Sequence, residues 1–428
     1  MLAGLMSLAA CSNDEGVVAD NNGAEQQFTI TLASSGDRAT RAAADRTLES
    51  EAADQSIEKV TLVVRSQDDG EDKNKVVYIH TLDNWNGTAT DDTNGHGKKL
   101  TFTIPKADKL GAGSYVVTAV GYNEGNYNLK WPAKGDVLDK NITATTQADA
   151  EAKEVFAGEQ QFSVKDGKIK GTDASVDVTL HRQVAGAYGY FTSIPAKIGN
   201  TDVASIRMVS RSKNTVLTFG SFNSSFTTTD ANNVMYMVNG SVPATKTAKF
   251  LNGDEANVLF SAKITDWFPG GDENKDGVYD KKDTNWTKHY SGSYLKGSVF
   301  ASNFIVPFSA TQGKSTLELQ LLDATGNVLY AWPVKLDASN AQVGKKGETA
   351  SADLFGTGTA MGFAETADVF SLFRNHIYSI GIHKQDTTNP DPETPVPGDQ
   401  PTDLSKIQNV VIRVNDNWEA MHHMSIDE

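Results

Sequence analysis

A run of acidic residues in the second half of the chain has the composition and spacing of a calcium-binding loop. The run DENKDGVYDKKD spans residues 272–283. Gly277 falls at its sixth position, where a calcium loop needs a sharp turn. The residues at ligand positions are Asp272, Asn274, Asp276, Val278 through its carbonyl, Asp280 and Asp283. Because Ca²⁺ prefers a ring of oxygen ligands, the sequence predicts a structural calcium ion here, with a solvated acidic loop as the alternative.

The last ligand position distinguishes this loop from the commonest type. Asp283 stands where most calcium loops have Glu, and in this respect the loop resembles those of dockerins and related extracellular repeats. The sequence contains no second copy, and the flanking residues do not predict a regular helix pair. We therefore expect an ion that fixes a surface loop rather than a signalling switch.

Sequence patterns that would support catalysis are incomplete. The eight histidines include no pair at zinc-protease spacing, and the adjacent His422 and His423 would point to opposite faces of a strand. Ser293 and Lys296 match S-x-x-K, but the motifs that accompany it in penicillin-binding enzymes are absent. The glycine-rich run at residues 356–362 lacks dinucleotide-binding spacing. The sequence therefore predicts a protein that is not an enzyme.

Composition and charge define the broad class. The chain has 428 residues with 39% hydrophobic content, which is enough for two ordinary domain cores. Its 36 glycines and many Thr, Val, Asn and aromatic residues favour strands and turns over helices. A formal net charge of -15 argues against nucleic-acid binding, which needs a basic face. We expect a mostly β protein with two sandwich domains.

Strand patterns recur along the chain at the spacing typical of β-sandwiches. In the first predicted domain, residues 56–183, they lie at 57–64, 76–81, 100–104 and 115–120, with a closing strand near 176–185. The second predicted domain, residues 184–385, contains the clearest hairpin, whose apolar residues alternate on both sides of a turn at 323–327. Its last predicted strand lies at 375–382. The pattern predicts two antiparallel domains that meet near residue 184.

The N-terminal residues predict export as a lipoprotein. Residues 1–11 form an apolar segment that ends in Leu-Ala-Ala-Cys, which resembles the cleavage and lipidation motif of bacterial lipoproteins. We expect Cys11, the single cysteine, to carry the lipid; the alternative is an ordinary buried or exposed thiol. No later apolar run approaches the roughly 20 residues needed to cross a bilayer. The protein is therefore expected to contact a membrane only through the precursor's lipid.

A short strand and an arginine-containing loop follow in the spacer of residues 12–55. Phe28, Ile30 and Leu32 alternate, so they share one face of a strand. Residues 34–55 are small and polar, and they include three arginines, Arg38, Arg41 and Arg46. Such a segment is typical of an exposed, protease-accessible loop.

The C-terminal residues predict a strand on a tether. Residues 386–404 contain five of the twelve prolines and predict an extended spacer. The final segment comprises residues 405–428. Its even-numbered residues would share one face of a strand, and this face is apolar at Val410, Ile412, Val414 and Trp418 and interrupted by Asp416. No segment adjacent in the sequence can pair with this strand, so we expect its apolar face to be available to another molecule.

Together these features resemble the fimbrillins, the subunits of type V pili of Bacteroidales, and are most similar to the minor-fimbrium subunit branch. The resemblance covers nearly the whole chain, and it is carried by the order of several short motifs. These are the Cys11 motif, the strand at Phe28 followed by the arginine loop, IEKVTL at 57–62, VTLHRQVA at 178–185, RNHIYSI at 374–380, and a proline-rich tether before a terminal strand with a tryptophan.

The resemblance implies a mechanism of assembly. The precursor would reach the outer membrane as a surface lipoprotein, and a protease specific for arginine would cut after Arg41 or Arg38, or less favourably after Arg46. The cut would release the strand at Phe28, Ile30 and Leu32 and open a groove. A neighbouring subunit's terminal strand, with Val410, Ile412, Val414 and Trp418, would fill that groove. Both domains would then be transthyretin-like sandwiches.

The partners implied are other copies of the chain, related fimbrial subunits and a host or bacterial surface receptor. The product would be an extracellular fimbria that supports adhesion and biofilm formation. A second hypothesis is a tip or accessory adhesin of the same pili, whose second domain binds a surface glycan or protein. A third is a surface lipoprotein hydrolase. The donor-like tail favours the first hypothesis, because a terminal subunit has no acceptor ahead of it to fill.

Overall fold

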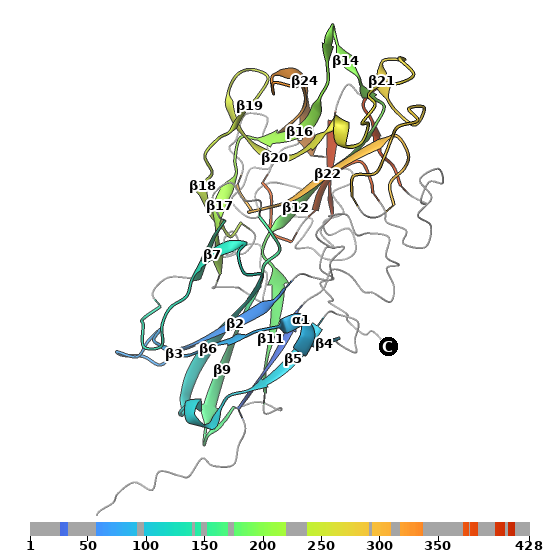
Figure 1. Cartoon of the computed structure of the whole chain (residues 1–428). Coiled ribbons are helices and arrows are strands. Elements are labelled where there is room, and N and C mark those ends of the chain that lie inside the picture. The colour runs from blue at the N-terminus through green and yellow to red at the C-terminus, as the bar shows by residue number, and fades with distance from the viewer. Residues whose placement is uncertain are drawn as a thin grey trace, which may run out of the picture.

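The structure is a computed structural model of the chain, in which two β lobes stack end to end (Figure 1). It describes residues 26–32, 57–91, 98–138, 142–146, 152–169, 175–219, 238–290, 293–309, 317–336, 371–375, 377–383, 399–406 and 410–415. One large group of buried side chains forms the core of the N-terminal lobe, and a second forms the core of the C-terminal lobe and extends across the junction to Val63, Val76 and Val120. Nearly every described element is a strand, which confirms the mostly β class. The transthyretin-like identity of each lobe stays a prediction.

The N-terminal lobe is built on a nine-stranded sheet in the order β3-β2-β6-β9-β11-β1-β5-β4, with β10 beside β9. Its strands are β1 (Gln27–Leu32), β2 (Lys59–Ser66), β3 (Val76–Leu82), β4 (Thr90–Asp91), β5 (Lys98–Thr103), β6 (Gly113–Tyr122), β9 (Phe156–Lys165), β10 (Lys168–Ile169) and β11 (Ser175–Arg182). The short helices are α1 (Trp85–Thr88) and η3 (Lys106–Asp108).

This sheet folds over itself between β9 and β11. The two strands pair only at His181 with Ala157 and at Arg182 with Phe156, so β11 diverges from β9 along the rest of its length. Gly158 permits the close approach at this corner, since a Cβ there would meet the Thr179 carbonyl oxygen at 2.0 Å. The two halves of the sheet then enclose one core between them.

The C-terminal lobe is built on a ten-stranded sheet in the order β19-β20-β16-β23-β24-β27-β25-β12-β22, with β26 beside β12. Its strands are β12 (Ala185–Thr192), β16 (Ser205–Ser210), β19 (Ala248–Lys249), β20 (Glu255–Lys263), β22 (Ser298–Ile305), β23 (Leu317–Leu322), β24 (Val328–Leu336), β25 (Ile377–Ile380), β26 (Thr402–Asp403) and β27 (Val410–Asn415). The small pairs are β13 (Ile194–Pro195) with β21 (Val278–Tyr279) and β14 (Lys197–Ile198) with β15 (Thr201–Asp202), and η4 spans Ile264–Asp266.

The predicted hairpin is confirmed as β23 and β24. The Asp323 carboxylate organises its turn by accepting hydrogen bonds from the backbone amides of Thr325 and Asn327, at 2.8 and 2.9 Å. These bonds and those from the two side chains lower the pKa of Asp323 to about 2. The alternation of apolar residues therefore predicted this hairpin correctly, because its partners are adjacent in sequence.

A four-stranded sheet crosses between the lobes, in the order β18-β17-β8-β7. Strands β7 (Tyr127–Lys130) and β8 (Ile142–Thr146) come from the first half of the chain, and β17 (Asn214–Phe219) and β18 (Gly240–Pro243) come from the second. The predicted boundary at residues 183 and 184 falls between β11 and β12, but this shared sheet carries strands from both sides of it. The sequence pattern did not reveal that exchange.

A buried polar network fixes the junction of the lobes. The Arg182 guanidinium donates to Glu154 at 2.8 and 2.6 Å, and both side chains are 1% exposed. Arg374 donates to the backbone carbonyl of Arg182 at 3.2 Å. Gln183 donates to the carbonyl oxygens of Ala157 and His181 and accepts from the Asn239 amide at 2.9 Å. Because the Arg182 and Glu154 side chains are both buried, removing one charge leaves the other in an environment that water does not reach.

We predict that Glu154→Ala lowers the free energy of unfolding by about 3–5 kcal/mol, because it removes the carboxylate that pairs with the buried Arg182 guanidinium. The control is Asp69→Ala, which breaks the exposed ion pair with Lys73 and changes stability by less than about 1 kcal/mol. Urea denaturation followed by circular dichroism measures both. Equal effects of the two variants would contradict the structural role assigned to the buried pair.

Candidate functional site

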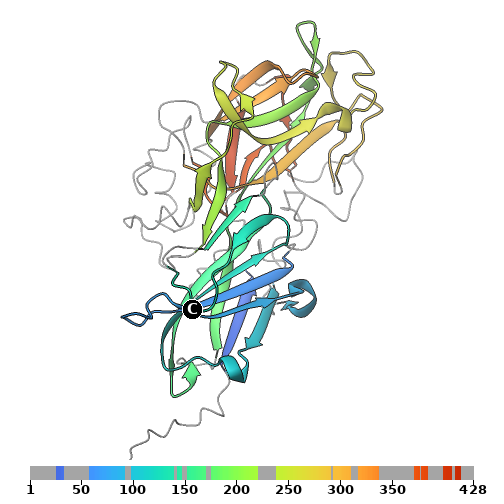
Figure 2. The same cartoon turned by 60° about the vertical axis from the view of Figure 1, so that its left-hand side comes forward.

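The first strand of the chain occupies an interior place in its sheet. β1 pairs with β11 in parallel over all six of its residues, from Gln27 with Ser175 to Leu32 with Leu180. On its other side β1 pairs antiparallel with β5, with Phe28 opposite Phe102 and Ile30 opposite Leu100. In Figure 2, β1 is the dark blue strand of the lower lobe. The place that β1 fills, between β11 and β5, is called the β1 slot below.

Apolar side chains anchor β1 in the N-terminal core. Phe28 and Ile30 are both 0% exposed and belong to the same buried group as Val176, Val178 and Leu180 of β11. The Phe28 ring meets the edge of Phe162 at 5.4 Å between centroids. The inward direction predicted for Phe28 and Ile30 is confirmed. Leu32 is placed by its backbone at the end of the strand.

A buried glutamine clamps the start of the strand. The Gln26 side chain donates to the carbonyl oxygens of Leu110 and Gly167, at 2.9 and 3.2 Å, and it accepts from the Leu110 amide at 2.8 Å. Its own carbonyl accepts from the Ile104 amide at 2.9 Å. Sequence reasoning missed Gln26, because Leu110 and Gly167 are distant in sequence and a polar residue before a strand usually predicts exposure.

The terminal strand has partners within its own chain. β27 pairs in parallel with β24, from Val410 opposite Val334 to Ile412 opposite Leu336, and antiparallel with β25, where Val414 lies opposite Tyr378. The expectation that this strand is unpaired is therefore corrected: β24 and β25 accept it through tertiary contacts that no sequence neighbour could indicate. Each side contributes three residue pairs, compared with six and five for β1.

The end of the predicted tether is docked rather than extended freely. β26 pairs in parallel with β12, where Thr402 lies opposite Phe191, and the Leu404 side chain is 3% exposed. The Tyr190 hydroxyl donates to the Asp399 carboxylate at 2.7 Å. Within the described part of the tail, residues 399–406 are thus attached to the C-terminal lobe, and this changes the predicted spacer of residues 386–404 only over residues 399–404, since residues 386–398 lie outside the described residues.

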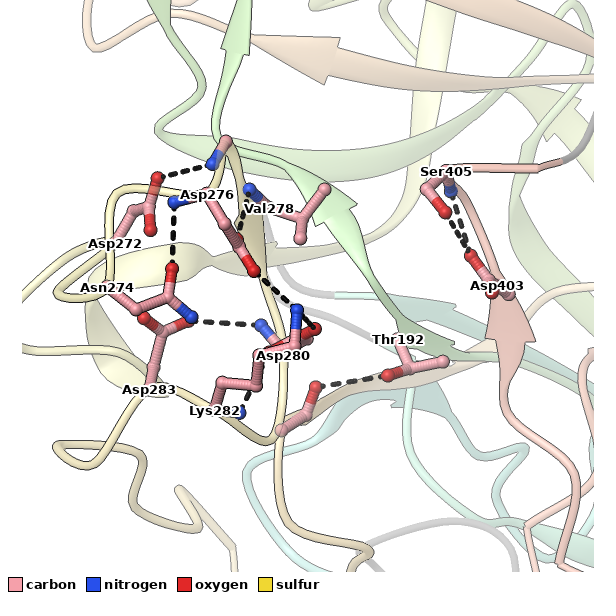
Figure 3. A network of polar contacts seen from close by, with 12 residues as sticks. Thr192, Asp272, Asn274, Asp276, Val278, Asp280, Lys282, Asp283, Asp403 and Ser405 are labelled. Atoms are coloured by element: carbon pink, nitrogen blue, oxygen red, sulfur yellow. Dashed lines mark hydrogen bonds and ion pairs between the residues drawn. The ribbon is translucent and has the colours of Figure 1, made fainter.

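The acidic loop uses many of its oxygens to stabilise its own turns. Asp272 accepts from the Gly277 amide at 3.0 Å and Asn274 accepts from the Asp276 amide at 2.8 Å. Asp283 is 0% exposed and accepts from the amides of Glu273 and Asp280, at 2.9 and 3.1 Å (Figure 3). The Gly277 carbonyl accepts from the amide of Ala196, which lies between β13 and β14 and ties the base of the loop to that segment.

A lysine occupies the acidic side of this loop. The Lys282 ammonium donates to Asp276 at 2.5 Å and lies 3.5 Å from Asp280 (Figure 3). The hydrogen bond from Lys282 holds the pKa of Asp276 below its ordinary value. Among the described residues, no group of three or more His, Cys, Asp or Glu side chains is placed to hold a metal ion. One oxygen of Asp272 is buried without a hydrogen-bond partner, and calcium at this loop stays a prediction.

Several predicted site residues lie outside the described residues: Cys11, Arg38, Arg41, Arg46 and Trp418. The structure therefore brings together β1 and its slot, places β27 in the other lobe, and leaves lipidation and cleavage as predictions. No helix among the described residues is long and apolar enough to cross a membrane.

We predict that Gln26→Ala lowers the free energy of unfolding by at least about 2 kcal/mol, because it leaves the amide and carbonyl of Leu110 and the Gly167 carbonyl buried without partners. Gln27→Ala is the matched control, since Gln27 makes an exposed hydrogen bond to Thr103 at 3.3 Å. Urea unfolding curves for the two variants provide the comparison. A smaller loss for Gln26→Ala than for Gln27→Ala would refute the clamp.

For the acidic loop, added Ca²⁺ is expected to raise the melting temperature of the wild type, and the double variant Asp272→Ala with Asp276→Ala is expected to abolish that response. Lys282→Met is expected to increase the response, because the ammonium competes for Asp276 and Asp280. Differential scanning calorimetry with calcium and with chelator measures each case. An identical response to chelator in the wild type and the double variant would contradict the predicted calcium site.

The comparisons with known proteins give similarity only at the level of structure. No protein-family model matches the chain, and no curated protein matches its sequence. Similar solved structures include a proposed adhesin from Bacteroides ovatus, at 12% identity and a TM-score of 0.39, covering 85% of this chain and 97% of that one.

Two further structures have names that mention fimbriae. A fimbrial assembly protein from Parabacteroides distasonis has 12% identity and a TM-score of 0.36, covering 85% of this chain and 93% of that one. The fimbrial anchor protein of Porphyromonas gingivalis has 10% identity and a TM-score of 0.35, covering 92% and 98%. These names are of the kind that the fimbrillin resemblance predicted. Similarity at this level assigns no function.

Proposed function

We propose that this chain is a structural subunit of a surface fimbria that polymerises by strand donation. The observation that supports the proposal most directly is the position of β1. A first strand lies between β11 and β5 with Phe28 and Ile30 in the core, and the sequence that follows it contains three arginines in a small, polar segment. Cleavage in that segment leaves β1 held by noncovalent contacts alone.

Loss of β1 creates a site that only another strand can fill. The facing edges of β11 and β5 lose their ladders, and the core loses Phe28 and Ile30. Unpaired backbone groups and an apolar slot are each costly in water. An added strand satisfies both at once, because its backbone completes the two ladders and its alternate side chains enter the core.

The donor in this proposal is β27 of a second copy. Val410, Ile412 and Val414 follow the same alternation as the apolar residues of β1. In its own chain β27 is held by three residue pairs on each side, so its release breaks a shorter ladder than the one it forms in the β1 slot. Since donor and slot are different parts of one chain, the contact runs head to tail and extends into a filament.

Export and processing complete the proposal. Lipidation at Cys11 holds the precursor at the outer membrane, and an arginine-specific protease cuts after Arg41 or Arg38, or after Arg46. Any of these cuts separates the lipid and β1 from the remaining subunit. Adhesion, biofilm formation and a surface receptor belong to the assembled fimbria in this proposal.

A tip or accessory adhesin of the same fimbriae is the second candidate. The observation that favours it is the pairing of β27 with β24 and β25 of its own chain, because a strand retained there cannot be donated. In that case the subunit accepts a strand and ends the filament. Its second lobe then binds a glycan or protein on another surface.

We predict that limited digestion with an arginine-specific protease converts the purified full chain into ladders that resist SDS. A chain ending at Lys406 retains β26 and Leu404 but lacks β27, and after the same digestion it yields no ladder. Gel electrophoresis measures the polymers, and mass spectrometry of the released peptide identifies the arginine.

The shortened chain also provides the control for folding. It retains the β1 slot, so adding it in excess, after the same digestion, to the digested full chain is expected to shorten the ladders by ending growth. Ladders from the shortened chain alone would refute donation by β27. Absence of ladders from the full chain, with β27 protected from amide exchange, would instead favour the accessory adhesin.

A further inference from the structure

The residues that enter β1 and those that enter β27 share a pattern beyond their apolar alternation. The chain reads QQFTITL at residues 26–32 and QNVVIRV at residues 408–414. In both, a glutamine stands two residues before the first apolar position, and isoleucine takes the middle apolar position. This similarity bears on how a strand from a second copy enters the β1 slot.

We propose that the terminal strand of a second copy enters the β1 slot in one register and one direction, with Gln408 as the residue that sets the register. Val410 takes the place of Phe28, Ile412 that of Ile30 and Val414 that of Leu32. The strand runs parallel to β11 and antiparallel to β5, as β1 does. This inference rests on strand donation as proposed above, and it adds the residue that recognises the slot.

The slot requires an amide at its entrance. When β1 leaves, the amide and carbonyl of Leu110 and the carbonyl of Gly167 lose the side chain of Gln26, and these groups are buried. They comprise one donor and two acceptors, so the replacement must both accept and donate. Gln408 offers the same carboxamide on the same length of side chain. It therefore supplies the same hydrogen bonds when the strands superimpose residue for residue.

Other registers lose either the clamp or the core contacts. A shift by one residue turns Arg413 or Asn409 toward the core, since the side-chain period of a strand is two. A shift by two in one direction puts Val410 in the place of Gln26, where its side chain can form no hydrogen bond. The opposite shift puts Lys406 there and pushes Gln408 into the apolar place of Phe28, and an ammonium cannot accept from the Leu110 amide.

The reversed direction fails at the same point. With Ile412 still in the place of Ile30, a reversed strand brings Asp416 to the clamp. A carboxylate accepts from the Leu110 amide but faces the carbonyl oxygens of Leu110 and Gly167, to which it has nothing to donate. Burying that charge without a donor partner is costly.

The register also determines which residues of the donor strand lie in the slot. Pairing with the slot covers residues 409–414, matching the six residues of β1, so Trp418 lies four residues beyond the position of Leu32 and outside the slot. Val410 is smaller than Phe28, whose ring contacts Phe162. The chain's own first strand therefore fills the slot more fully than the donor strand. The donor can replace it only after cleavage, when β1 is held by noncovalent contacts alone.

Disulfide trapping tests the register directly. The side chains of Thr29 and Thr101 are adjacent across β1 and β5, with 3.2 Å between their hydroxyl oxygens, and Val411 replaces Thr29 in the proposed register. Full-length donor with Cys11→Ser and Val411→Cys is mixed with acceptor carrying Cys11→Ser and Thr101→Cys, and both are digested together. Matched acceptors carry Thr103→Cys or Lys99→Cys, each two residues away on β5. Nonreducing gels report the cross-linked pairs.

The expected result is a disulfide with the Thr101→Cys acceptor and not with the other two. A disulfide only with Thr103→Cys or Lys99→Cys, or ladders without any disulfide, would overturn the register while leaving strand donation intact. Absence of ladders in the wild type would overturn the proposed function itself.

Variants of the donor test the role of Gln408 separately. Ladders of Gln408→Ala are expected to dissociate in SDS at a lower temperature than those of Asn409→Ala, because the counterpart of Asn409, Gln27, makes an exposed hydrogen bond. Gln408→Glu is expected to behave like Gln408→Ala, since a carboxylate cannot donate to the two carbonyl oxygens. Equal dissociation temperatures for the Gln408→Ala and Asn409→Ala ladders would refute the clamp role.

Discussion

The pairing of β1 with both of its neighbours is the constraint on which the N-terminal lobe depends. A strand inside a sheet satisfies two rows of backbone groups, and its removal leaves both rows without partners. β1 adds two buried anchors, Phe28 and Ile30, and the Gln26 clamp at its start. These contacts are the basis of the proposal that the β1 slot accepts a strand with the same alternation and the same polar entrance.

The two terminal strands have the same kind of environment in opposite lobes. β1 and β27 each have one parallel and one antiparallel neighbour, and each fills a gap between strands that do not pair with one another. Both strands are therefore paired within their own chain. The proposed exchange between copies would replace contacts of one kind with contacts of the same kind, and the difference in free energy would then depend on ladder length, side-chain fit and the Gln26 hydrogen bonds.

The junction between the lobes relates the slot to the rest of the chain. β11 ends at Arg182, whose ion pair with Glu154 is buried, and β12 begins three residues later. The sheet shared by β8 and β17 spans the same boundary. β11 forms one wall of the β1 slot, and β12 carries the docked tail at β26. Under the proposed function, this junction would hold the acceptor slot and the base of the donor strand at a constant separation.

Local pattern in the sequence determined the features that depend on near neighbours. The hairpin of β23 and β24, the inward faces of Phe28 and Ile30 and the mostly β class all follow from alternation and turn residues. Tertiary structure alone decided the partners of β27, the docking of Leu404, the exchange of β8 between lobes and the role of Gln26. The physical reason is that hydrogen bonds between strands join backbone groups that every residue carries, so the sequence specifies which face is apolar but leaves the choice of partner to the packing of the whole chain.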